Sequence, residues 1–214
     1  MSDAKINDEV VAYASVLKLS RLDVKTLKIK DAYGLHKVVY GLFDDVRSDV
    51  EKQASTASGI IYADKGGDFN TRQILMLSNR KPHQTPQFGE VQSKPIHADF
   101  LTHKRYAFDM TLNPTKRDKQ TGKVVAIKGR DDIAAWFIAR APQSCGFAVT
   151  AEYLQVGQMS VQVFEKDGRT VTHGSAALTG ELVVTDQERF IRSFTRGIGR
   201  GRAFGFGLLQ IVPL

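Results

Sequence analysis

The chain has 214 residues, which is enough for one large domain or for two domains of roughly 100 residues that each bury a core. Its 30 Lys and Arg residues outnumber its 23 Asp and Glu residues, and the net charge of +7 favours a polyanionic partner over a neutral metabolite. The single cysteine, Cys145, excludes an internal disulfide and a zinc site with paired cysteines, while the polar amino terminus and the lack of a long apolar run predict a cytoplasmic protein that does not enter a membrane.

The first elements expected along the chain are a strand and a helix. Residues 10–20 form an apolar run rich in valine and leucine, which predicts the strand. Asp31 is a typical helix N-cap residue, and apolar residues recur after it at helical spacing. Tyr33 and His36 lie three positions apart near the start of this helix, so their side chains are expected on one face.

Paired strands are expected next. Residues 48–58 are polar and small, which predicts a loop. Residues 59–63 and 73–78 predict two strands that pair about turn residues 65–68. Residues 91–96 predict a further short strand, and the second helix of this half of the chain is poorly defined by the sequence.

A polar link at residues 95–103 predicts a boundary between two domains, residues 1–98 and residues 99–214. Residues 105–112 begin a new alternating strand after this link. Residues 113–123 and the apolar sequence that follows predict a basic hairpin, for which a solvated loop is the alternative. The basic residues of this segment are Lys116, Arg117, Lys119 and Lys123.

The second half continues with a helix and a strand pair. Residues 131–140 predict a helix that Pro142 ends. Residues 159–166 and 170–185 predict two strands about a turn, the second interrupted near Gly180.

The order of these elements predicts the fold. Asp186 is the expected N-cap of a last helix, which leads through a glycine-rich segment into an apolar terminal strand. The order strand, helix, strand, strand, helix, strand thus occurs in the second half and, with its weak second helix, in the first. We therefore predict an α+β fold of two tandem ferredoxin-like (RRM-like) domains. Because RNA-recognition modules share this fold, it argues weakly for RNA and not at all for cleavage.

The glycine-rich segment predicts an anion-binding loop. Glycines allow positive φ angles and a close approach of backbone N–H groups to a ligand, and arginines add guanidinium groups that bind phosphate. A surface turn is the alternative. No Gly-Lys-Ser/Thr follows, and the glycines come after a helix and before a strand, so neither a Walker loop nor a dinucleotide-binding motif is present. The residues concerned are Gly197, Gly199, Gly201, Gly205 and Gly207, with Arg200 and Arg202 between them.

Three motifs resemble a known family. The repeated Gly-apolar-Gly spacing and the ending Gly-Phe-Gly-Leu-Leu with a terminal Pro-Leu resemble the C-terminal signature of CRISPR repeat-RNA endonucleases of the CasE type, from subtype I-E systems. The helix sequence Tyr33-Gly-Leu-His36 resembles the Tyr-x-x-His of these proteins, and Leu112-Asn-Pro-Thr-Lys116 resembles their domain junction. The resemblance covers the whole chain, although Arg200-Gly201-Arg202 departs from the looser family pattern.

The resemblance implies a function and a site. It implies that His36 is the catalytic histidine, that Tyr33 is its aromatic partner, and that the basic hairpin and the glycine loop contact a CRISPR repeat stem-loop. The implied reaction is one cut in the precursor crRNA at the 3′ side of the stem-loop, which leaves a 2′,3′-cyclic phosphate and a 5′-hydroxyl. Similarity also implies retention in a Cascade complex with other subunits.

The chemistry of RNA cleavage suits these residue types. RNA carries its own nucleophile, the 2′-hydroxyl, and a histidine that titrates near neutrality can accept its proton or donate one to the departing 5′ oxygen. Tyr33 would hydrogen-bond the phosphate or ribose, and a cation from the glycine loop would stabilise the phosphorane. The acidic pairs at residues 44–45 and 131–132 are typical of helix ends and not of a two-metal nuclease, so we expect neither a metal nor a cofactor.

Two rival functions remain open. A non-catalytic RNA-binding subunit of a CRISPR ribonucleoprotein would use the same hairpin and glycine loop. It would differ from the endonuclease only in the role of His36, which would perform no chemistry. A small-molecule enzyme of ferredoxin-like fold would bind its ligand with weak salt dependence, whereas RNA binding weakens steeply with salt.

Overall fold

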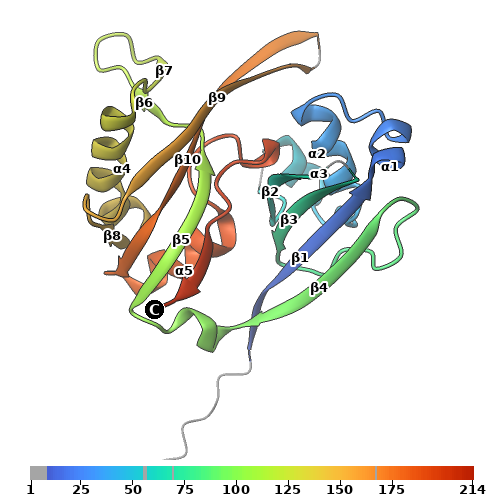
Figure 1. Cartoon of the computed structure of the whole chain (residues 1–214), viewed down its shortest axis with the longest axis horizontal. Helices are drawn as coiled ribbons and strands as arrows, with labels where there is room; N and C mark the ends of the chain where they lie inside the picture. The colour runs from blue at the N-terminus through green and yellow to red at the C-terminus, as the bar shows by residue number, and fades with distance from the viewer. Residues whose placement is uncertain (1–8, 55–56, 69, 167) are drawn as a thin grey trace, which may run out of the picture.

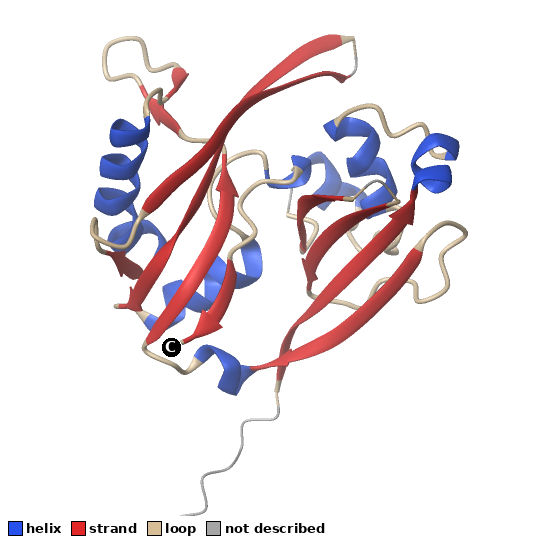
Figure 2. Ribbon diagram, viewed as in Figure 1, coloured by secondary structure: helices blue, strands red, loops and turns tan. Residues whose placement is uncertain are grey.

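Two main antiparallel β-sheets, one in each half of the chain, organise the computed structural model, which describes residues 9–54, 57–68, 70–166 and 168–214 (Figures 1 and 2). The strand order is β2-β3-β1-β4 in the first sheet and β11-β5-β10-β8 in the second, where β9 also pairs with β10. In both sheets the first and third strands of the unit lie at the centre, as in ferredoxin-like domains. The second half has the full strand-helix-strand-strand-helix-strand order, whereas in the first half no helix lies between β3 and β4, where the sequence defined the second helix poorly. The predicted fold class is confirmed.

The first half contains four strands and three helices: β1 (Val10–Ser20), α1 (Arg21–Thr26), α2 (Ala32–Tyr40), α3 (Asp49–Gln53), β2 (Ile60–Gly67), β3 (Thr71–Ser78) and β4 (Glu90–His97). A 3₁₀ turn, η1 (Ala98–Leu101), connects β4 to the second sheet. The boundary predicted between residues 98 and 99 falls within this turn and stays a prediction.

The second half follows in chain order: β5 (Arg105–Leu112), β6 (Thr115–Arg117), β7 (Val124–Ala126), α4 (Arg130–Cys145), β8 (Phe147–Val149), β9 (Gln155–Lys166), β10 (Arg169–Val184), α5 (Gln187–Arg196), η2 (Arg202–Phe204) and β11 (Gln210–Pro213). The expected basic hairpin is β6 paired with β7. Within the described residues, none of the helices is both long and apolar enough to cross a membrane.

Two short helices were missed by the sequence analysis. The expected loop at residues 48–58 is wrong in part, because Ser48 and Glu51 form a capping box that begins α3: the Glu51 carboxylate accepts from the Ser48 N–H at 2.8 Å. Ser20 and Asp23 form the same reciprocal motif at the start of α1. Each motif satisfies backbone N–H groups that a helix start leaves free, so very short helices form despite weak apolar patterning.

The turn predicted at residues 65–68 is also wrong in part. β2 continues to Gly67, where the register with β3 shifts between Asp64 and Gly67. A Cβ atom at Gly67 would lie 1.8 Å from the Thr71 carbonyl oxygen, so this close approach of two strands requires glycine.

Pro142 does not end its helix as predicted. α4 continues to Cys145 and stops at Gly146, whose φ is +79°. Proline lacks an N–H donor, and its ring crowds the carbonyl group four residues earlier. The buried residues of α4 nevertheless recur every four positions and pack on the second sheet: Ile133, Phe137, Ala141 and Cys145. This packing outweighs the lost hydrogen bond.

The interruption expected near Gly180 is absent from β10, which runs unbroken from Arg169 to Val184. Gly180 pairs with Phe108 of β5, and a Cβ atom there would lie 2.7 Å from the Tyr153 carbonyl oxygen. The glycine therefore admits a close backbone neighbour and does not break the strand.

The two faces of the first sheet determine where the site forms. Successive side chains of β2 point to opposite faces, so Ile60 and Tyr62 join the core beneath α2, while Ile61 and Ala63 join the core of the second domain. The second domain therefore docks directly on the first sheet. This docking brings η2 and the glycine-rich segment against α2 (Figure 1).

Candidate active site

Helix α2 fixes the direction of His36. The Asp31 carboxylate accepts from the Gly34 N–H at 2.8 Å and caps the helix start, as predicted. Leu35 and Val39 are buried against the first sheet, which turns the neighbouring side of the helix toward the second domain. His36 is half-buried on that side.

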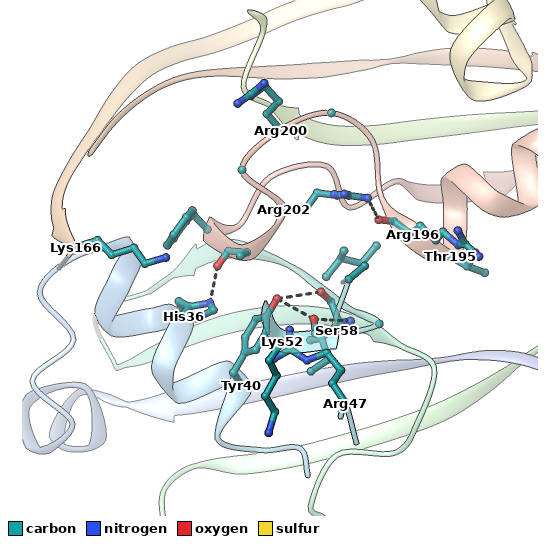
Figure 3. Close-up of a pocket in the computed structure, with 18 residues that line it drawn as sticks. His36, Tyr40, Arg47, Lys52, Ser58, Lys166, Thr195, Arg196, Arg200 and Arg202 are labelled. Atoms are coloured by element: carbon teal, nitrogen blue, oxygen red, sulfur yellow. Dashed lines mark hydrogen bonds between the residues drawn. The ribbon is translucent and has the colours of Figure 1, made fainter. Parts of the chain in front are cut away.

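A hydrogen bond to the glycine-rich segment sets the protonation pattern of His36. Its Nδ1 lies 2.9 Å from the Ala203 carbonyl oxygen of η2 (Figure 3). A carbonyl oxygen can only accept, so Nδ1 donates, and the neutral ring carries its lone pair on Nε2. Nε2 is therefore the nitrogen available to take a proton from a ligand.

The surroundings of His36 also favour its neutral form. Burial lowers the pKa of His36 below its ordinary value of 6.5, and the positive charges of Lys166 and Lys37 lower it further, against the opposing effect of the Ala203 hydrogen bond. At neutral pH the His36 ring is therefore mostly neutral and able to accept a proton.

Three aromatic rings surround His36. Tyr33 stacks at 6.0 Å between ring centroids with an interplanar angle of 10°, on the face that the sequence predicts. Tyr40 lies nearer, at 4.1 Å, and Phe204 of η2 lies at 5.6 Å. Tyr40 was missed, although its position four residues after His36 signals a shared helix face.

His36 lines a pocket of about 620 Å³ between the two domains (Figure 3). The first domain contributes α2 and the segment around α3, and the second contributes the end of α5, the glycine-rich segment and the last residue of β9. None of the described residues that line it is acidic. Six are basic: Arg47, Lys52, Lys166, Arg196, Arg200 and Arg202. Such a pocket suits an anionic ligand.

These six cations are not equally available to bind an anionic ligand. The Asp45 carboxylate binds Arg47 at 2.9 Å and is 3.8 Å from the Lys52 ammonium. The Lys166 ammonium lies 5.9 Å from the Phe204 ring centroid, beside His36, on an exposed side chain. Lys166 was missed because β9 is remote from α2 in the sequence.

The five glycines of the predicted loop all have positive φ, between +74° and +89°. The loop is fixed to its surroundings by the backbone: Gly207 donates to the Thr111 carbonyl at 2.8 Å and accepts from the Ile198 N–H at 2.9 Å. A Cβ atom at Gly207 would lie 2.2 Å from the Ile198 carbonyl oxygen. The glycines are thus needed for the shape of the loop, and their contact with phosphate stays a prediction.

The two arginines of the loop differ. Arg202 donates from Nη1 to the Arg196 carbonyl oxygen at 2.9 Å, so it caps the end of α5. Arg200 is exposed at the edge of the pocket, away from His36 (Figure 3). Phosphate binding by either remains a prediction.

The structure does not bring the basic hairpin to His36. No described residue of the hairpin lines the pocket, and Figure 1 shows β6 and β7 far from α2. The basic side chains are exposed, and Arg117 donates to the Gly122 carbonyl within the hairpin. Contact with RNA stays a prediction for all four basic residues, which are Lys116, Arg117, Lys119 and Lys123.

A second basic groove, of about 380 Å³, adjoins the pocket along α5. Arg196 and Arg202 line both, which makes one continuous basic surface. Arg189 and Arg192 extend it along the helix, and their spacing of three and four residues from one another and from Arg196 is the signal that the sequence analysis passed over.

Within the described ranges, no three His, Cys, Asp or Glu side chains are grouped as metal ligands would be. Whether the chemistry needs a metal is a separate question, which chelation tests.

Comparison with known proteins assigns the family. A family described as CRISPR associated protein matches residues 13–213. The chain belongs to this family. Among relatives of this CRISPR-associated protein, the CRISPR-associated endoribonuclease Cse3 of Thermus thermophilus is 32% identical over 130 residues, which are 56% of this chain and 61% of that protein. The CRISPR system Cascade subunit CasE of Escherichia coli K12 is 23% identical over 203 residues, 92% of this chain and 99% of that subunit.

A solved structure shares the fold. CRISPR endoribonuclease Cse3 bound to a 19-nucleotide RNA superposes with a TM-score of 0.77 at 22% identity, over 94% of this chain and 99% of that one. Both domains of this CRISPR-associated protein thus have counterparts in an RNA-bound relative.

Proposed function

We propose that this protein is an endoribonuclease that binds a CRISPR repeat stem-loop and cleaves the precursor crRNA at its 3′ side. The observation that carries the proposal is the His36 ring, whose Nδ1 is engaged by Ala203 while Nε2 is left as a base in a pocket of basic residues. The names of the relatives, an endoribonuclease and a Cascade subunit, support the same function.

The proposed reaction uses the nucleophile within the RNA. His36 accepts the 2′-hydroxyl proton through Nε2, and the oxygen attacks the adjacent phosphorus in line with the departing 5′ oxygen. The products are a 2′,3′-cyclic phosphate and a 5′-hydroxyl. The 5′ oxygen takes its proton from the Lys166 ammonium or from water.

Two side chains complete the proposed chemistry. Lys166 stabilises the charge that develops on the phosphorane, since its ammonium lies beside His36. Tyr33 orients the phosphate or ribose from the same helix face. The glycine-rich segment and the basic hairpin bind the phosphate backbone, the reaction needs no metal, and the protein works in the cytoplasm with other Cascade subunits.

Single-turnover cleavage of the repeat RNA in EDTA, with end-group analysis, tests the proposal. We expect full cleavage in EDTA, because the nucleophile is internal and His36 performs the proton transfer. Loss of activity on chelation that magnesium restores would overturn the metal-independent mechanism.

Variants of His36 separate the enzyme from a non-catalytic RNA-binding subunit. His36→Ala should lower the cleavage rate on the order of 10² to 10⁴-fold and leave RNA affinity within a few fold. His36→Asn is the matched control, because its amide N–H₂ can still donate to Ala203 while no base remains. Tyr33→Phe tests the hydroxyl separately.

Each outcome has a distinct meaning. Equal loss of cleavage in both His36 variants at unchanged affinity supports general base catalysis. Near-normal cleavage in both variants would remove the catalytic assignment of His36, and a parallel collapse of affinity would make His36 a binding residue. RNA binding without cleavage by the unaltered protein would favour the non-catalytic subunit. Ligand affinity that hardly depends on salt would favour a small-molecule enzyme.

A further inference from the structure

Two hydrogen bonds depend on the position of the Ala203 carbonyl oxygen. It accepts from His36 Nδ1 at 2.9 Å and from the Tyr62 hydroxyl at 3.1 Å. Ala203 belongs to the single turn η2, which is bounded by Gly201 and Gly205, both left-handed. Because neither glycine has a side chain with which to pack, the position of this turn depends on contacts that other elements provide.

His173 of β10 provides such contacts. Its ring centroid lies 5.5 Å from that of Phe204 and 5.7 Å from that of Phe206, the residues at the end of η2 and just after it. A Cβ atom at Gly201 would lie 3.6 Å from the Cε1 atom of His173. The imidazole thus lies next to the start of η2 at Gly201, next to its end at Phe204, and next to Phe206 after the turn.

The sheet holds His173 firmly in this place. Phe164 of β9, which is buried, packs against the His173 ring at 5.7 Å and against Phe204 at 4.7 Å. Phe204 in turn contacts His36 on α2. A continuous set of rings therefore joins β9 and β10 to the catalytic histidine through η2.

The state of the His173 ring fits a packing role. Its Nδ1 atom is buried and has no hydrogen-bond partner, so this nitrogen does not determine the orientation of the ring. Burial and the positive charge of Arg200 lower the pKa of His173, which keeps the ring neutral. A neutral ring among three phenylalanines acts through its faces and edges.

We propose that His173 is a positioning residue, which holds η2 so that the Ala203 carbonyl keeps His36 in the form protonated at Nδ1. Its effect on cleavage rests on the proposed function, whereas its effect on the His36 ring does not. His173 never touches the RNA in this scheme, and it acts only through Phe204, Phe206 and the turn between Gly201 and Gly205.

Nitrogen-15 NMR of histidine-labelled protein measures this effect directly, because the two ring nitrogens report which of them carries the proton. In the unaltered protein we expect His36 to be protonated at Nδ1. In His173→Ala, which removes the ring, we expect His36 to become a mixture of both neutral forms. His173→Phe keeps the ring contacts and should restore the Nδ1-protonated form.

Cleavage should follow the same order. We expect His173→Ala to lower the single-turnover rate on the order of 10²-fold, the loss typical of a catalytic group displaced by about 1 Å, with RNA affinity within about threefold. His173→Phe should recover most of the rate. His103→Ala is the matched control, because its ring packs on Tyr106 at 5.9 Å and not on η2.

Several results would overturn the proposal. It is wrong if His36 stays protonated at Nδ1 in His173→Ala, or if His173→Phe is as impaired as His173→Ala. Should His173→Ala fail to fold, His173→Leu keeps apolar volume without a ring and must show the same change in His36. If the unaltered protein does not cleave repeat RNA, the proposed function fails, yet the NMR comparison still decides the role of His173.

Discussion

Removing the charge of Lys166 should change the cleavage reaction in two ways. Lys166 lies beside His36, and its positive charge is one cause of the lowered pKa of that histidine. In the proposed mechanism, proton transfer to His36 requires the neutral ring, so we expect the rate to rise with pH to a plateau. In Lys166→Ala the pKa of His36 rises, and the rise in rate therefore moves to higher pH.

The height of the plateau should fall as well. One enclosed donor to a developing negative charge contributes on the order of 10² to 10³-fold to the rate. Because the Lys166 side chain is exposed, solvent screens its charge, and we expect a loss of about 10 to 100-fold. Lys166→Arg keeps the charge and should keep the position of the pH profile.

Lys37 offers a matched control. Its charge also lowers the pKa of His36, but its ammonium lies 4.4 Å from the Tyr33 ring centroid and does not line the pocket. Lys37→Ala should therefore move the profile to higher pH and leave the plateau unchanged. Single-turnover cleavage at saturating RNA, from about pH 5 to 9, separates the two effects. An unchanged plateau in Lys166→Ala, or a shift to lower pH, would refute the reasoning.

Two further predictions concern binding and stability. Replacing the four basic residues of the hairpin by alanine should flatten the salt dependence of RNA binding. The slope of log affinity against log salt concentration should fall in magnitude by about 0.7 to 0.9 for each phosphate that the hairpin no longer neutralises. An unchanged slope would show that the hairpin does not contact RNA. Gly207→Ala should lower the free energy of unfolding by about 2 to 4 kcal/mol and the melting temperature by about 5 to 15 °C, from positive-φ strain and the clash with the Ile198 carbonyl. Gly66→Ala, at a φ of +67° with nothing within 4 Å, isolates the strain, so an equal loss of stability in both variants would contradict the role of the clash.

The sequence by itself determined the features that act over a few residues. Asp31 and Asp186 cap α2 and α5 because a side chain can reach N–H groups only two or three positions ahead. The spacing of Tyr33 and His36 places them on a shared helix face for the same geometrical reason. The glycines of the last loop allow positive φ, and the structure has it at all five positions.

The tertiary structure alone decided which residues meet. His36 and Ala203 are 167 positions apart, and they touch because the second domain docks on the face of the first sheet that Ile61 and Ala63 present. No local pattern encodes that docking, since it depends on the complementary shapes of two sheets that are far apart in the sequence. The same reason explains why Lys166 and His173 escaped the sequence analysis: each lies on an ordinary strand, and only the packing of β9 and β10 against η2 brings it near His36.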